Sequence, residues 1–145
     1  MNRQEIKDFI YLASGQHIHF YFVDAYKGTY SHTNFAAGIV KSKHRGGKHI
    51  IIDRNNWFSA TNESQKYQLL HEIGHIKDPN HSWHKGAASG ELFAQTWAIK
   101  RARKLGMPEI ARKCINGLKK WKLCKWNEYR PHVLAYRLAK QKGLI

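Results

Sequence analysis

The chain has 145 residues, the usual length of one compact domain, and its 42% hydrophobic and 12% aromatic content excludes an intrinsically disordered protein. Its formal net charge of +15 is uneven, because residues 100–145 carry 14 Lys and Arg against two acidic residues, and such asymmetry favours contact with nucleic acid or another polyanion. No apolar run is long enough for a membrane span, and the N-terminus lacks the pattern of a signal peptide. Cys114 and Cys124 form no C-x-x-C pair. We therefore expect a cytoplasmic protein.

The first part of the chain predicts a helix followed by a small antiparallel sheet. Residues 3–14 repeat apolar side chains at helical spacing. Residues 17–23 are rich in β-formers and predict a strand. Residues 36–40 and 49–53 predict two further strands, which the basic loop over residues 41–48 connects.

The rest of the chain predicts four helices, with proline and glycine near their boundaries. They are expected to run from the cap-forming segment Ser59–Ser64 to about Lys77, from Ser89 or Gly90 to about Lys104, from about Pro108 to Trp121, and from about Pro131 to Lys142. A helix, a small sheet and then several helices indicate an α+β fold. We expect a single domain over residues 1–145, with a basic helical C-terminal part from about 106–145.

One short string carries the strongest functional signal, His71-Glu72-Ile73-Gly74-His75. On a helix, histidines four residues apart lie one turn apart on one face and can hold the same metal ion. Neutral imidazoles with an open fourth position suit a catalytic zinc, and Glu72 is placed to take a proton from the water that such a zinc activates. Gly74 allows another element to approach this helix closely.

A catalytic zinc needs a third protein ligand, and two residues compete for this role. Glu91 begins the next predicted helix, and three alanines follow on its side of that helix, where small side chains let the two helices pack closely. His81 is the alternative, because it completes the spacing H-E-x-x-H-x-x-G-x-x-H except that Asp78 replaces the glycine. We favour Glu91, and Gln95, one turn further on, is a candidate to orient a ligand from behind.

HEIGH together with the segment Glu91–Ala98 (ELFAQTWA) resembles the gluzincin pattern H-E-x-x-H … E-x-x-A-[ND]-x-[FW]-A of the ImmA/IrrE family of HEXXH zinc metallopeptidases. The resemblance runs from residue 50 to about residue 104, and the chain departs from it at Gln95, where the family usually has Asn or Asp. Family members are bacterial and phage proteins, and those with known roles cleave transcriptional repressors. The resemblance implies a minimal zincin-like domain in which the sheet packs against the HEXXH helix. It also implies the zinc ligands His71, His75 and Glu91 and the catalytic base Glu72.

Other residues are candidates for substrate contacts. Tyr129, His132 and Tyr136, in or near the last predicted helix, could donate a hydrogen bond to the oxyanion that forms during peptide hydrolysis. The strand over residues 49–53 could offer an edge to which an extended peptide adds, or it could be buried. The basic C-terminal part interleaves cations with aromatic residues such as Trp121, which suits contact with phosphates and bases, although aromatics at helical spacing also serve as core.

The sequence therefore predicts a zinc-dependent metalloendopeptidase that cuts a protein or peptide substrate, such as a regulatory or nucleic-acid-associated protein. Nucleic acid is a further expected partner, through the basic C-terminal part, and a membrane is not. The alternative is a nucleic-acid-binding protein with a structural or degenerate zinc site. Glu72 favours the enzyme, because a structural zinc site needs no base.

Overall fold

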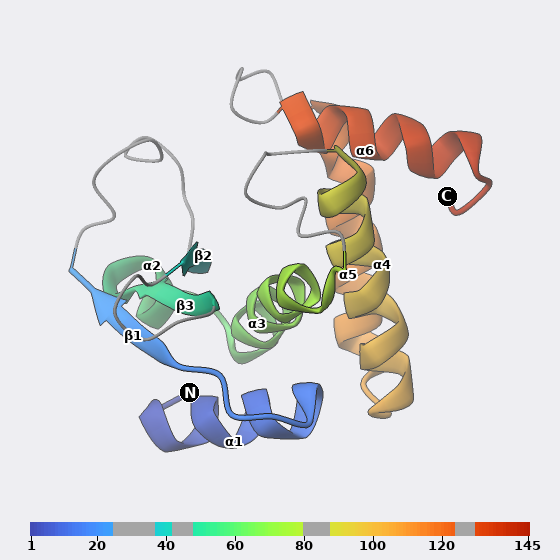
Figure 1. Cartoon of the computed structure of the whole chain (residues 1–145). Coiled ribbons are helices and arrows are strands. Elements are labelled where there is room, and N and C mark those ends of the chain that lie inside the picture. Colours follow the sequence, from blue (N-terminus) through green and yellow to red (C-terminus); the bar gives the residue numbers. More distant parts are fainter. Residues whose placement is uncertain (25–36, 42–47, 80–87, 124–129) are drawn as a thin grey trace.

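The computed structural model describes residues 1–24, 37–41, 48–79, 88–123 and 130–145. The helices in these ranges are α1 (Arg3–Ser14), α2 (Arg54–Ser59), α3 (Asn62–Lys77), α4 (Ala88–Lys104), α5 (Pro108–Lys120), the 3-10 helix η2 (Trp121–Leu123) and α6 (Arg130–Gln141). The strands are β1 (Phe20–Val23), β2 (Ala37–Lys41) and β3 (Lys48–Asp53). Figure 1 shows α3 in the middle of the molecule, between the sheet on one side and α4, α5 and α6 on the other. The predicted α+β arrangement is thus present, and the five long helices end within two residues of their predicted limits.

The prediction of an antiparallel sheet is wrong for one of the two strand pairings. The strand order is β1-β3-β2. β2 and β3 form the predicted antiparallel pair, with Ala37 opposite Ile52, whereas β1 runs parallel to β3, with Phe20 beside Ile50. The pattern of apolar residues specifies which side chains of a strand are buried, but not the direction of the strand beside it. The sheet is therefore mixed.

β3 lies in the centre of the sheet, so residues 49–53 do not form the edge that was considered for peptide binding. Every residue from His49 to Ile52 is buried, which confirms the alternative of a buried strand. A short helix that the sequence analysis missed, α2, follows directly. Its N-cap is Asp53, whose carboxylate accepts hydrogen bonds from the backbone N–H groups of Asn55 and Asn56 at 3.0 and 3.2 Å.

Two apolar clusters hold these elements together. The larger cluster joins α1, β3 and α3 with α4 and α5, and its fully buried members include Ile10, Ile52, Leu69 and Ile73. The smaller cluster joins α4, α5, η2 and α6 through Leu92, Leu118, Trp121, Ala135 and Ala139. The sheet therefore packs against the helix that carries HEIGH, as predicted, while the C-terminal helices form a second cluster beyond it.

Helices α3 and α4 pack unusually closely. Ala94, Ala98 and Ala102 are all 0% exposed, as expected for a small-residue face against the neighbouring helix. A Cβ atom on Gly74 would lie 2.6 Å from the carbonyl oxygen and 2.7 Å from the Cα atom of Ala94. No real side chain tolerates such a contact with backbone atoms, so the glycine is what permits this spacing, as the sequence predicted.

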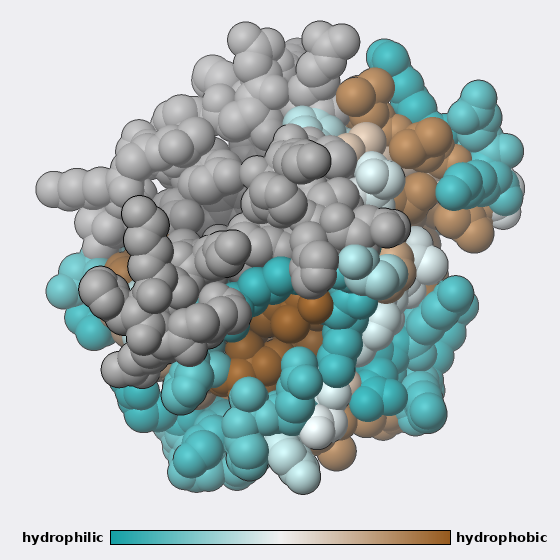
Figure 2. Space-filling view, viewed as in Figure 1, coloured by the Kyte–Doolittle hydropathy of each residue, from teal (hydrophilic) through white to brown (hydrophobic). Residues whose placement is uncertain are grey.

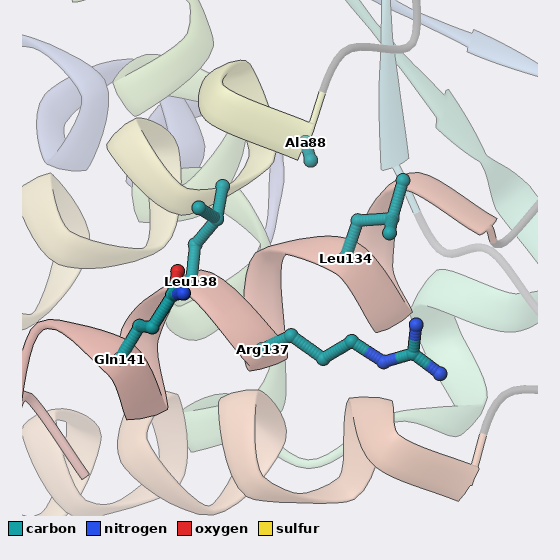
Figure 3. Close-up of a pocket in the computed structure, with 5 residues that line it drawn as sticks. All are labelled: Ala88, Leu134, Arg137, Leu138 and Gln141. Carbon is teal, nitrogen blue, oxygen red and sulfur yellow. The ribbon is translucent and has the colours of Figure 1, made fainter.

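The surface combines hydrophilic residues with apolar side chains near the C-terminus. Figure 2 shows hydrophobic residues among hydrophilic ones in the region of α6, where Leu134 and Leu144 are exposed. A pocket of about 520 Å³ lies between α6 and the start of α4, and Figure 3 shows the side chains that line it: Ala88, Leu134, Arg137, Leu138 and Gln141. None of these is a predicted site residue. Among the described helices, none combines the length and the apolar character needed to cross a membrane.

Substituting Gly74 tests the close contact of α3 and α4. Gly74→Ala should lower the free energy of unfolding by about 1–3 kcal/mol, because the added methyl forces the helices apart. The exposed control Asn62→Ala, in the first turn of α3, should stay within about 0.5 kcal/mol of the parent. Urea denaturation followed by circular dichroism measures both. An unchanged midpoint for Gly74→Ala would contradict the observed spacing.

Candidate metal centre

Three predicted ligands converge at the contact between α3 and α4. His71 and His75 lie one turn apart on α3, and their Nε2 atoms are 3.1 Å apart. Glu91, in the first turn of α4, places Oε2 3.2 Å from Nε2 of His71 and 3.4 Å from Nε2 of His75. Two tetrahedral zinc ligands with bonds of 2.0–2.1 Å lie about 3.3 Å apart. The three donor atoms thus have the mutual spacing of three corners of a zinc tetrahedron.

The chemistry of these donors also fits a cation. Oε2 of Glu91 is buried, and none of the imidazole nitrogens around it has hydrogen-bond geometry toward it. Burial alone would raise the pKa of Glu91, but His132, His71 and His75 outweigh it and hold that pKa well below its usual range. The carboxylate is therefore ionised, the form that binds metal, and a cation among the three donors would satisfy an otherwise orphaned oxygen.

Gln95 fixes the orientation of the His71 ring through Nδ1, the nitrogen opposite the one that faces Glu91. Its side-chain oxygen lies 2.7 Å from Nδ1 of His71, and its side-chain nitrogen donates to the carbonyl oxygen of Cys114 at 2.6 Å and to the hydroxyl of Tyr67 at 3.2 Å. Because the amide nitrogen faces a carbonyl, the amide oxygen must face His71, and Nδ1 of His71 must be the donor. When the ring is neutral, its lone pair is therefore on Nε2 and points toward the other ligands, as a metal site requires.

Two further residues of this network were missed by the sequence analysis. Tyr67 lies one turn before His71 on α3, and burial raises the pKa of its hydroxyl. Gly117 of α5 leaves room for that hydroxyl, since a Cβ atom on Gly117 would lie 2.6 Å from it and 3.2 Å from Nε2 of Gln95. A glycine inside a helix lowers helix stability by about 1 kcal/mol relative to alanine. Gly117, inside a predicted helix, is therefore a signal of close packing that is visible in the sequence.

Glu72 is enclosed with the candidate ligands but is not one of them. It is only 6% exposed, and among the described residues the group able to hold a metal consists of His71, His75 and Glu91. Burial raises the pKa of Glu72, while the neighbouring histidines oppose that rise. A carboxylate with a raised pKa beside a metal group has the properties of a general base.

Of the three predicted oxyanion donors, the structure brings His132 to the site. Its Nε2 lies 3.2 Å from Oε2 of Glu91. Trp121 makes T-shaped contacts with both imidazoles, with ring centroids 4.7 Å from His132 and 6.0 Å from His71. Tyr136 packs instead against the smaller apolar cluster. Tyr129 and the alternative ligand His81 lie outside the described residues.

Replacing Gln95 tests its role behind His71. Gln95→Leu should weaken zinc binding by about 10- to 100-fold, because His71 loses the acceptor that orients it. The control Tyr67→Phe removes a hydroxyl from the same network but leaves that acceptor in place, so its zinc affinity should stay within about threefold of the parent. Competition with a chromophoric chelator measures both affinities. Equal losses in the two variants would contradict the assigned role.

Zinc binding should release a proton from His71. Burial lowers the pKa of its ring, but Glu91 and Glu72 outweigh burial and raise that pKa from 6.5 to about 9. The zinc-free protein therefore carries a protonated His71 at pH 7.5, whereas zinc binds only the neutral ring. The stabilisation from this proton is fully present below pH 6.5 and is lost as the pH rises through about 9.

Calorimetric titration in two buffers with different protonation enthalpies measures this release. We expect about one proton per zinc at pH 7.5, and an apparent zinc affinity that rises up to about pH 9 and levels off above it. Zinc binding at pH 7.5 without proton release would contradict the raised pKa.

No protein family model, curated protein or solved structure matches this chain. The resemblance to the ImmA/IrrE family therefore rests on HEIGH and on the segment Glu91–Ala98. The spacing, burial and charge of the three donors, together with the hydrogen-bond network of Gln95 and His71, indicate a candidate metal centre independently of that resemblance.

Proposed function

We propose that this chain is a zinc-dependent metalloendopeptidase of the HEXXH type, with a minimal zincin-like domain and a cytoplasmic location. The observation that carries the proposal is the spacing of 3.1, 3.2 and 3.4 Å among the donor atoms of His71, His75 and Glu91. These distances match the edges of a zinc tetrahedron, and three protein ligands leave one position for a water or a substrate. Buried Glu72 beside them supplies the base.

When bound at these residues, zinc would lower the pKa of a water molecule to about 7 and polarise the carbonyl to be cleaved. Glu72 would accept a proton from the attacking water as the water oxygen bonds to the carbonyl carbon. Glu72 then passes the proton to the amide nitrogen as the carbon–nitrogen bond breaks, which yields a carboxylic acid and an amine, and the acid loses its remaining proton to the amine or to solvent. His132 is the described residue that stands near Glu91 with a ring nitrogen able to donate to the developing oxyanion.

The sheet offers a place for an extended peptide next to α3. β2 is an edge strand of the described sheet, and it also contacts α3. Main-chain hydrogen bonds to a free strand edge hold a peptide in an extended form that does not depend on its side chains. β2 thus takes the role that the sequence analysis considered for residues 49–53. A protein substrate with an extended, accessible segment fits this arrangement.

The alternative is a nucleic-acid-binding protein with a structural or degenerate zinc site. A structural zinc site is closed by four protein ligands, whereas the group here has three described members. Burying the carboxylate of Glu72 also costs free energy, and a structural zinc site does not need that carboxylate. Both observations favour the enzyme.

Removing the base separates zinc binding from catalysis. Glu72→Gln should retain stoichiometric zinc and the parent melting temperature, but should lower cleavage of fluorescein-labelled casein by at least about 100-fold. The control Glu63→Gln changes an exposed glutamate in the first turn of the same helix and should cleave at the parent rate. Metal analysis, thermal denaturation and the casein assay report the three properties.

Two results would contradict the proposed mechanism. One is a Glu72→Gln variant that cleaves as fast as the parent. The other is a zinc-loaded parent that leaves both casein and a mixed peptide library intact.

A further inference from the structure

The solvent side of α5 carries a row of cations. Arg112, Lys119 and Lys120 are exposed and Lys113 is half-buried, while the opposite side of the helix is buried against the core through Ile110, Ala111, Cys114 and Leu118. At about 100° per residue, the four cations fall on one face of the helix. Lys122 in η2, also exposed, adds a fifth cation directly after the helix. We call these five residues the α5 basic stripe.

Little acidic charge lies near the α5 basic stripe. In the described ranges from residue 100 to residue 145, the acidic residue is Glu109, which forms an ion pair with Arg112. The stripe therefore keeps a net positive charge. Exposed cations near the end of α4, Lys100, Arg103 and Lys104, add to the charge of this part of the molecule.

The composition of the stripe favours a polyanion over a folded protein partner. Lysine is depleted in protein–protein interfaces, which rely on aromatic and apolar anchors, and the exposed face of α5 offers no such anchor. From residue 112 to residue 122 the stripe spans about 15 Å, a length over which a nucleic acid duplex presents about nine phosphates. The negative charge of the phosphates is complementary to the positive charge of the stripe.

The aromatic residues do not support binding through stacked bases. Trp121, which the sequence analysis considered for stacking, is only 9% exposed and packs against His71 and His132. Trp126 and Tyr129 lie outside the described residues. The described part of the C-terminal helices therefore offers cations but no exposed aromatic face on the stripe, which indicates contact with the phosphate backbone rather than with bases.

We propose that the α5 basic stripe binds the phosphate backbone of nucleic acid without sequence specificity. The proposal does not depend on the candidate metal centre, because the stripe residues are distinct from Cys114 and Gly117, the α5 residues that lie against Gln95. A protein substrate that is itself bound to nucleic acid would be brought near the peptidase site by this contact.

The test compares two triple variants with the same change in net charge. The stripe variant is Lys113→Gln, Lys119→Gln and Lys120→Gln, and the control neutralises three exposed lysines elsewhere, Lys7, Lys140 and Lys142. Fluorescence anisotropy of zinc-loaded protein with a labelled 20-bp DNA duplex, from 50 to 300 mM KCl, gives the dissociation constant and its salt dependence. Circular dichroism and zinc content verify that both variants fold.

For the parent protein, the logarithm of the affinity should fall linearly with the logarithm of the salt concentration. The stripe variant should lower the magnitude of this slope by about 2–3, since each phosphate contact contributes about 0.9, and the control should lower it by less than about 1. Duplexes of unrelated sequence should bind within about threefold of one another.

Three outcomes would overturn the proposal. The first is no binding by the parent at 50 mM KCl. The second is an equal loss in the two triple variants, which would assign the effect to net charge alone. The third is competition by polyglutamate as strong as that by duplex DNA at equal charge, which would indicate an acidic protein partner. None of these outcomes concerns casein cleavage, so failure here and failure of the proposed peptidase activity are distinguishable.

Discussion

The close contact of α3 and α4 at Gly74 determines where the donor atoms of the candidate site lie. His75 directly follows Gly74, and Glu91 lies one turn before Ala94, whose backbone would meet any side chain at position 74. Metal sites tolerate shifts of only about 0.2 Å in ligand distances. A wider separation of these helices would therefore remove the carboxylate from the two imidazoles. The site is a consequence of helix packing, which is rigid, rather than of a loop conformation.

A buried polar network behind the ligands depends on α5 in turn. Gln95 is 0% exposed, yet each of its polar atoms has a partner, from His71, Tyr67 and the backbone of Cys114. Leaving one such buried group unpaired costs about 1–3 kcal/mol, so the network is stabilising only when it is complete. Its completeness requires Gly117, which disfavours the helix that contains it. Gly117 thus lowers the helix propensity of α5 but permits the network that holds His71 in one orientation.

Local patterns in the sequence were sufficient for the parts of the site that lie on α3 and α4. The spacing of HEIGH and the alanines after Glu91 are properties of single helices, and the structure brings His71, His75 and Glu91 together as those patterns predicted. The parallel pairing of β1 was not predictable in this way, because strand direction depends on contacts between distant segments. The same reason applies to Tyr67 and Gly117, whose roles exist only where α3, α4 and α5 meet. The sequence offers His132 as one of three equal candidates for the oxyanion donor, and only the position of α6 beside Glu91 distinguishes it.

The distribution of charge makes the proposed peptidase site and the α5 basic stripe compatible. Glu72 and Glu91 are enclosed at the candidate metal centre, away from the exposed cations of the C-terminal helices. The cations of the stripe face solvent on one side of α5, whereas the candidate metal centre lies toward the other side of this helix, which is about 10 Å across. Phosphates bound at the stripe would therefore be separated from the carboxylates of the candidate site by α5 and would not compete for the same cations. A single helix, α5, can thus support His71 through its inner side and carry a nucleic acid on its outer side.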